Sequence, residues 1–379
     1  MTKRNIQISL PSMGQEEWEA VKEPIETGWI TQGPKVREFE KIFAEMHNVK
    51  HALAVSNCTT ALHIALVTLG ITDGDEVIVP AFTWVSTANA VMYCNATPIF
   101  VDIDPVTFNI DIEQIAAKIT SRTKAIIPVH LFGLCADIPE IKRRFPSLKI
   151  VEDGACAAGS AINNHPAGSL GDIGCFSFHP RKSVTTGEGG MLTTQSDELA
   201  QIMDRLRNHG ASVSEEQRHH GPKPYILPSF DVVGYNYRMT DIQGAIGVVQ
   251  LRKLDRFISE RQKWADYYVE KLSDIPWLRM PKVPNGYKHG WQSFVTFIDE
   301  SISPVKRNQI MEIMQTNGIA TRPGTHAVHM LNFYSSKFGI GPQDYPGAYA
   351  ADQFSMSIPL HNRMSSEDFD YVISVLKSI

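Results

Sequence analysis

One lysine stands where a strand-like segment meets a glycine-rich turn. The apolar run of residues 173–178 leads to Lys182, and small, hydroxylated and glycine residues then continue to Gly190. A lysine held at such a junction can be desolvated, so its amine becomes partly neutral and nucleophilic. A solvated lysine in a surface loop is the alternative, but the surrounding pattern favours a reactive amine. Such an amine can hold pyridoxal phosphate (PLP) as a Schiff base.

A carboxylate lies upstream of this lysine, at the end of another predicted strand. Leu148, Ile150 and Val151 form a short apolar run, and Glu152 and Asp153 follow directly. Ligands of open α/β sheets bind outside the carboxyl ends of the strands, so this position suits chemistry. A carboxylate beside a pyridine nitrogen keeps it protonated and makes the ring an electron sink. A solvated acid or a helix cap is the alternative reading of Asp153.

A predicted helix start supplies the third element. Strand-like residues 52–55 lead into Cys58 and Thr59, and leucines at helical spacing then continue to Gly70. Free amides at a helix N-terminus, flanked by hydroxyl groups, form an anion site suited to a phosphate. Threonine caps are common at helix starts. This pattern therefore indicates a phosphate site only in combination with the other two elements.

The three elements follow one another in an order that points to a known family. The chain resembles the DegT/DnrJ/EryC1/StrS family of sugar aminotransferases, of the fold-type I PLP superfamily, over nearly its whole length. The other matching segments are residues 28–40, 74–91, 96–111, 125–133, 234–251, 321–331 and 357–361. The resemblance implies an α/β fold, with a large domain whose mostly parallel central sheet is flanked by helices and a small C-terminal α+β domain.

The resemblance also implies roles for single residues. Lys182 would bind the cofactor and carry the proton of the reaction, and Asp153 would face the pyridine nitrogen. Trp84 would stack on the cofactor ring, which suits an indole. The residues expected around the phosphate are Cys58, Thr59, Ser177 and, from the neighbouring subunit, Asn236.

Cys156 departs from the family pattern. Many relatives have glutamine or histidine at this place, near the phenolic oxygen of the cofactor. A thiol donates weakly, so we expect either a water in that contact or a different arrangement, and Cys156 stays a candidate cofactor-binding residue.

Two histidines, His326 and His329, lie in a segment that the resemblance places near the substrate opening, so we expect them to contact the substrate. No third and fourth ligand accompanies them at a workable spacing, and we therefore predict no metal site. His130, at the end of an apolar run, is interpreted as a core histidine with satisfied hydrogen bonds.

The activity implied by the resemblance is the transfer of an amino group from L-glutamate to a nucleotide-linked keto-sugar. An NDP-4-keto-6-deoxyhexose is favoured, in aminosugar and polysaccharide biosynthesis, with a homodimer that shares its active sites. One alternative is a PLP-dependent sugar dehydratase of the same fold, but such relatives have histidine where this chain has Lys182. The other is a non-catalytic regulatory protein, and the intact set of candidate residues argues against it.

Composition sets limits on the partners and the location. The chain has 379 residues, with 36 Lys and Arg against 41 Asp and Glu, and the net charge of −5 argues against a nucleic-acid-binding surface. The five cysteines show no C-x-x-C spacing and are expected as reduced thiols. There is no apolar signal core and no run of about 18 apolar residues, so we expect a cytoplasmic protein without a membrane segment.

Strand-like runs alternate with helical patterns up to about residue 250, as in a mostly parallel sheet. The expected strands are residues 51–56, 76–80, 97–103, 124–130, 148–152, 173–178 and 190–194. A long helix over residues 240–273 is expected to join a large domain, 1–250, to a small domain, 251–379. A polar, proline-rich loop is predicted over residues 213–233, and a capping box predicts the start of the last helix at Ser365.

Overall fold

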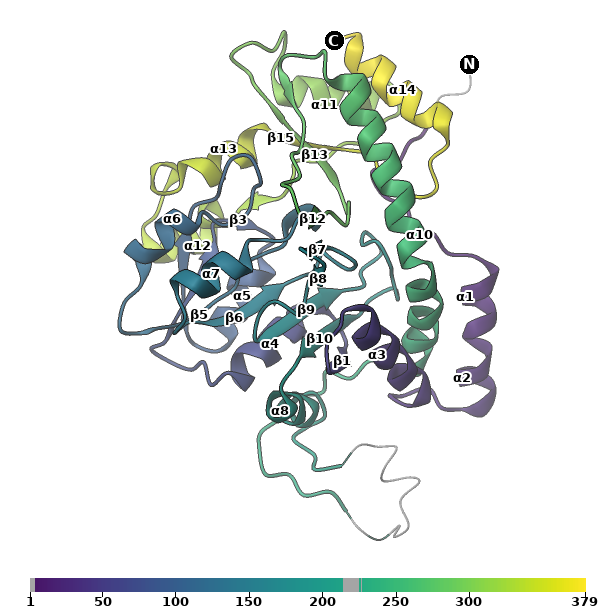
Figure 1. The fold of residues 1–379 in the computed structure, drawn as a ribbon, viewed down its shortest axis with the longest axis vertical. Helices are drawn as coiled ribbons and strands as arrows, with labels where there is room; N and C mark the ends of the chain where they lie inside the picture. The colour runs from purple at the N-terminus through teal and green to yellow at the C-terminus, as the bar shows by residue number, and fades with distance from the viewer. Residues whose placement is uncertain (1–3, 214–224, 226) are drawn as a thin grey trace.

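A seven-stranded sheet forms the centre of the computed structural model, which describes residues 4–213, 225 and 227–379 (Figure 1). In spatial order its strands are β1 (His51–Val55), β10 (Gly190–Thr194), β9 (Ile173–Ser177), β6 (Lys149–Asp153), β5 (Thr123–Ile126), β2 (Glu76–Pro80) and β4 (Thr97–Val101). The pairs from β9 to β4 are parallel, whereas β10 runs antiparallel to both β1 and β9. The predicted mostly parallel sheet is confirmed.

The strands form because their side chains are buried on both faces of the sheet. In β2, Val77 and Val79 contribute to one apolar cluster and Ile78 to another, and all three are completely buried. Such continuous apolar runs are typical of parallel strands covered by helices on both sides. Helix α4 (Cys58–Thr68) packs into the first cluster and helix α3 (Pro34–Met46) into the second.

Further helices and small strands surround the seven-stranded sheet. The helices are α1 (Gln15–Ala20), α2 (Lys22–Thr27), α5 (Ser86–Tyr93), α6 (Ile112–Ile115), α7 (Ile138–Arg144), α8 (Asp197–Arg207), α12 (Asn332–Phe338) and α13 (Pro346–Phe354). The small strands are β3 (Phe82–Thr83) with β14 (His326–Ala327), and β12 (Tyr287–Lys288) with β7 (Ala161–Ile162) and β8 (His165–Pro166).

A long helix, α10 (Asp241–Leu272), connects the central sheet to the C-terminal elements (Figure 1). Its first turn is stabilised by a capping box between Thr240 and Gln243. Around its second half lie the sheet β11 (Leu278–Arg279), β13 (Phe294–Ile298) and β15 (Ser355–Ile358), and the helices α11 (Arg307–Thr316) and α14 (Ser366–Lys377). These elements share a separate apolar cluster. The boundary predicted at residue 250 falls inside α10, and the division into two domains stays a prediction.

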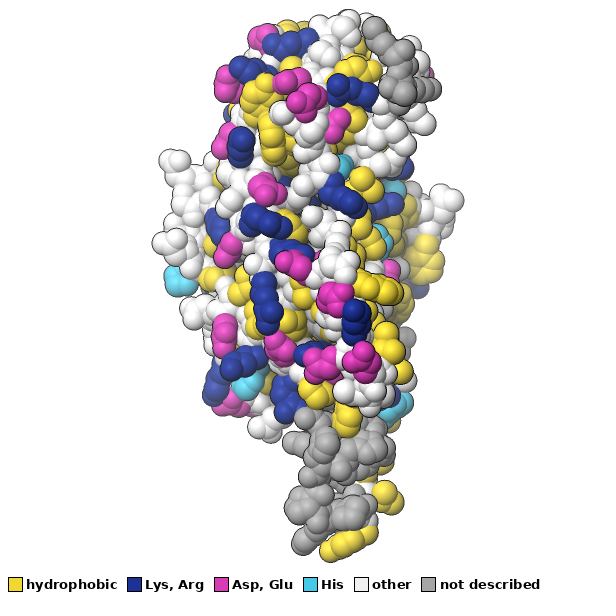
Figure 2. Space-filling view, turned by 90° about the vertical axis from the view of Figure 1, so that its right-hand side faces the viewer, with side chains coloured by type: hydrophobic (Ala, Val, Ile, Leu, Met, Phe, Trp, Pro, Cys, Tyr) yellow, Lys and Arg dark blue, Asp and Glu magenta, His cyan; other side chains and the backbone are white. Residues whose placement is uncertain are grey.

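The outer face beside α10, α1 and α2 carries charges of both signs in alternation (Figure 2). Lys253 of α10, for example, forms ion pairs with Glu16 and Glu17 of α1. None of the helices in residues 4–213 and 227–379 is both long and apolar enough to cross a membrane.

Part of the predicted loop over residues 213–233, namely residues 214–224 and 226, lies outside the described residues. In its described part, Leu227, Phe230 and Val233 expose 78%, 61% and 89% of their surfaces.

Candidate active site

Lys182 lies just after β9, in the turn between β9 and β10, and is partly buried. Its Nζ donates a hydrogen bond to Cys156 Sγ at 3.1 Å. Burial lowers the pKa of Lys182, but Cys156, Cys58 and Asp153 raise it, and the net pKa lies above the usual lysine value. The sequence-based expectation of a partly neutral amine is therefore wrong for this arrangement, because the acidic and sulfur-containing neighbours outweigh burial.

Asp153 ends strand β6 and is buried beneath helix α5. Its Oδ2 accepts a hydrogen bond from Thr87 Oγ1 at 2.8 Å, and its Oδ1 accepts one from the Ala155 N–H at 3.2 Å. The Thr87 hydroxyl lies in turn 3.0 Å from Thr83 Oγ1. Burial raises the pKa of Asp153, and the bonds from Thr87 and Ala155 oppose that rise. Each oxygen keeps room for another donor.

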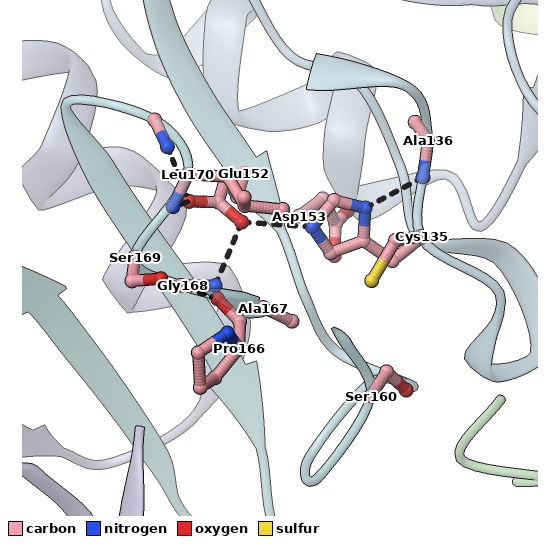
Figure 3. A network of polar contacts seen from close by, with 12 residues as sticks. Cys135, Ala136, Glu152, Asp153, Ser160, Pro166, Ala167, Gly168, Ser169 and Leu170 are labelled. Carbon is pink, nitrogen blue, oxygen red and sulfur yellow. Dashed lines mark hydrogen bonds and ion pairs between the residues drawn. The ribbon is translucent and has the colours of Figure 1, made fainter. Parts of the chain in front are cut away.

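The neighbouring Glu152 holds this strand end in place (Figure 3). Its completely buried carboxylate accepts hydrogen bonds from His130 Nε2 at 2.9 Å and from backbone N–H groups of the 168–171 turn. His130 Nδ1 accepts from the Ala136 N–H, so Nε2 carries the proton donated to Glu152. The interpretation of His130 as a satisfied core histidine is confirmed, and the network fixes the backbone that carries Asp153.

The N-terminus of α4 lies at the same edge of the sheet. Asn57 caps the helix, Cys58 is its first residue, and Thr59 Oγ1 donates to Ser86 Oγ at 3.0 Å. Gly190 of β10 packs directly against this turn, since a Cβ there would lie 2.5 Å from the Asn57 carbonyl carbon and 2.8 Å from the Cys58 nitrogen. The first amides of a helix have no partner within it, so this helix start could hold an anion.

Four further predicted residues differ in their exposure. Ser177 is the last residue of β9 and is partly buried. Trp84 exposes 58% of its surface, and its ring lies 5.5 Å from that of His326, since β3 pairs with β14. His329, in contrast, is completely buried against Tyr345. Only His326 of the two histidines is thus open to a substrate in this structure.

Asn236 is exposed, and its backbone pairs with that of Asn208. The flanking rings of Tyr235 and Tyr237 stack at 4.9 Å. Within the described part of the chain, no hydrogen bond joins Asn236 to Lys182. A contact of Asn236 with the phosphate of a second subunit stays a prediction.

The structure thus brings Lys182, Asp153, Cys58 and Cys156 together, close enough that each of the other three shifts the pKa of Lys182. A lysine amine, a buried carboxylate with spare acceptor capacity and a helix N-terminus match the carbonyl, the ring nitrogen and the phosphate of PLP. The donor set therefore fits this cofactor. In the ranges that the structure describes, no group of three or more His, Cys, Asp or Glu side chains is arranged to hold a metal ion.

Sequence reasoning missed Thr87, which contacts Asp153 directly. The hydroxyl-rich start of α5 was a possible signal, because a completely buried threonine at a helix start needs a partner. The partner itself is 66 residues away in the sequence, and only the fold reveals it.

Comparisons with known proteins agree with this site. The family model described as the DegT/DnrJ/EryC1/StrS aminotransferase family matches residues 11–377. The GDP-perosamine synthase of Caulobacter vibrioides is 39% identical over 379 residues, covering 99% of this chain and 98% of that protein. The spore coat polysaccharide biosynthesis protein SpsC of Bacillus subtilis is 38% identical over 384 residues, covering 100% and 98%.

A solved structure supports the same assignment. The PLP form of a putative sugar aminotransferase from Streptococcus pneumoniae superposes with a TM-score of 0.90 at 28% identity, covering 99% of this chain and 98% of that one. The chain belongs to the DegT/DnrJ/EryC1/StrS aminotransferase family and is a PLP-dependent aminotransferase.

Proposed function

We propose that this aminotransferase moves the amino group of L-glutamate to a nucleotide-linked keto-sugar, with an NDP-4-keto-6-deoxyhexose as the favoured acceptor. The observation that carries amino transfer is the meeting of Lys182, Asp153 and the α4 N-terminus at one edge of the sheet. Support for the sugar comes from the GDP-perosamine synthase and SpsC, which match this chain over nearly its full length. The product would enter polysaccharide synthesis, and a cytoplasmic location stays a prediction from composition.

The proposed roles follow from the positions of the side chains. When bound, PLP supplies an electron sink that stabilises negative charge on the substrate carbon. Lys182 Nζ takes the proton from the carbon of the amino donor and later delivers one to the keto carbon of the acceptor.

The other candidate residues would bind and orient the cofactor and the substrate. Asp153 would accept a hydrogen bond from the ring nitrogen, while Thr87 and Ala155 hold its carboxylate in place. The α4 amides of Cys58 and Thr59, together with Ser177, would bind the phosphate. Trp84 would stack on the ring, and Cys156 would lie beside the lysine that binds the cofactor. His326, which lies against Trp84, borders the substrate opening.

We also propose a homodimer in which Asn236 reaches the phosphate bound by the partner subunit. The exposed position of Asn236 and the exposed apolar side chains of Leu227, Phe230 and Val233 support this assembly. Apolar side chains gathered in one exposed segment mark an interaction site, and a two-fold axis would create two shared active sites.

An acceptor panel tests the proposed function. The purified enzyme is supplied with PLP, L-glutamate and UDP-, GDP- or dTDP-linked keto-sugars, and formation of 2-oxoglutarate is measured together with the mass of the sugar product. We expect one nucleotide keto-sugar to be aminated in proportion to 2-oxoglutarate, and Lys182→Ala to remain inactive. Amination of a simple keto acid, with none of the keto-sugars converted, would contradict the proposed acceptor.

A further inference from the structure

A cavity lies between α10 and the segment that precedes α14, and none of its lining residues belongs to the candidate active site. Its volume is about 240 Å³, enough for a small organic ion. The lining side chains are Glu260, Arg261, Trp264, Leu360, His361, Asn362 and Met364. The cavity is thus lined by both polar and apolar side chains.

The guanidinium group of Arg261 reaches this cavity with part of its hydrogen-bonding capacity unused. Only 3% of the residue is exposed. Its Nε donates to Asn362 Oδ1 at 2.8 Å, and its Nη1 donates to the carbonyl groups of Trp291 and Gln292. Among the described residues, Nη2 has no acceptor, and no carboxylate lies within 4.0 Å of the guanidinium nitrogens.

A buried positive charge is costly, because the low-dielectric interior cannot replace its hydration, and the Glu260 carboxylate offsets this cost only in part. Burial accordingly lowers the pKa of Arg261 to about 10. The three hydrogen bonds are to neutral oxygens and satisfy the donors without neutralising the charge. An anion in the cavity would supply an acceptor for Nη2 and negative charge in addition to that of Glu260.

We propose that this cavity is a binding site for a small carboxylate with a short apolar chain. An N–H group of Nη2 can donate to a carboxylate oxygen, while Trp264, Leu360 and Met364 offer apolar surface to the chain. The nearby carboxylate of Glu260 disfavours a phosphate dianion, since like charges repel. His361 adds no further donor, because its Nε2 lies 3.1 Å from the Gln7 carbonyl and its Nδ1 accepts from the Arg363 N–H.

Sodium butyrate is a suitable probe. Binding to the PLP-loaded enzyme is measured by isothermal titration at constant ionic strength, with acetate and inorganic phosphate in parallel. We expect saturable binding in the order butyrate, acetate, phosphate. A crystal of the holoenzyme soaked in butyrate should show the carboxylate within hydrogen-bonding distance of Arg261 Nη2.

Two variants and one control variant test the roles of Glu260 and Arg261 in butyrate binding. Glu260→Gln removes the repelling charge and should tighten butyrate binding. Arg261→Lys removes Nη2 and should weaken it about tenfold or more, because a hydrogen bond to a charged group is lost. Arg252→Lys makes the same chemical change at an exposed position of the same helix and should leave binding unchanged.

Several results would overturn the proposal. They are a titration without saturable heat, phosphate bound more tightly than butyrate, a soaked crystal without a ligand at Nη2, or weaker binding in Glu260→Gln. The wild-type crystal and Glu260→Gln decide the question even if Arg261→Lys fails to fold.

Discussion

Lys182 Nζ and Cys156 Sγ lie 3.1 Å apart and are joined by a hydrogen bond. Cys156 is also the position at which the family resemblance predicts glutamine or histidine. The thiol is one of the groups that raise the pKa of Lys182 against the effect of burial. Cys156 therefore affects the protonation of Lys182 as well as the cofactor contact expected from the family pattern.

Replacing Cys156 by alanine should lower the pKa of Lys182, because burial would remain while one group that raises the pKa is lost. The measurement is the rate at which protein freed of PLP takes up the cofactor, followed by visible absorption across pH. Only the neutral amine attacks the cofactor carbonyl, so the variant should reach its full rate at lower pH than the wild type. Cys94→Ala, which removes a buried thiol at the end of α5, is the control and should not shift the profile.

Thr87 should matter to the reaction because it holds Asp153. Thr87→Val removes the donated hydrogen bond, raises the pKa of the buried carboxylate further and should slow conversion of the cofactor by L-glutamate about tenfold to a hundredfold. Thr87→Ser keeps the hydroxyl and should retain most of the rate. Equal rates for the valine and serine variants would show that the hydroxyl has no part in positioning Asp153.

His47 should make the fold sensitive to acid. It is buried, donates Nδ1–H to the Ala167 carbonyl at 2.8 Å, and has its pKa lowered by burial to about 4. The unfolded chain binds this proton at higher pH than the folded protein, so stability falls as pH drops from about 6.5 to about 4. At pH 5 this single group should cost about 2 kcal/mol of the free energy of unfolding.

Urea unfolding at pH 7 and pH 5 measures this effect. His47→Gln keeps a side-chain donor for Ala167 but does not titrate, so its loss of stability between the two pH values should be smaller than that of the wild type. His165→Gln changes an exposed histidine and serves as the control. The same pH dependence in all three proteins would refute the assignment to His47.

The shared active site can be tested by mixing two impaired chains. Lys182→Ala lacks the reactive amine, and Asn236→Asp places a negative charge where a phosphate should bind. A mixed dimer would contain one site with both native residues, so activity should recover above that of either parent. No recovery in mixed dimers, or an active monomer in sedimentation, would exclude sharing.

Much of the central sheet could be predicted because its strands are continuous apolar runs, as in Val77, Ile78 and Val79 of β2. The long helix was expected over residues 240–273 and is found at Asp241–Leu272, since Thr240 gives a clear start. Strand β5 was expected to continue to residue 130 but ends at Ile126. Pro128 lacks the N–H group that a continuing ladder requires.

Less of the candidate active site could be predicted from the sequence. Lys182 and Asp153 stand out because each follows a predicted strand, and parallel strands bring such ends together. The hydrogen bond of Thr87 to Asp153 and the raised pKa of Lys182 depend on contacts between distant segments. Neither the burial of His329 nor the exposure of His326 could be read from their spacing.

The most direct test of amino transfer through Lys182 is the visible absorption of the PLP-loaded enzyme during titration with L-glutamate, with 2-oxoglutarate measured in the same samples. The account predicts that the cofactor band is lost as one equivalent of 2-oxoglutarate forms per active site, and that Lys182→Ala shows neither change at a comparable rate. An unchanged wild-type spectrum, or a Lys182→Ala protein that turns over like the wild type, would contradict the account.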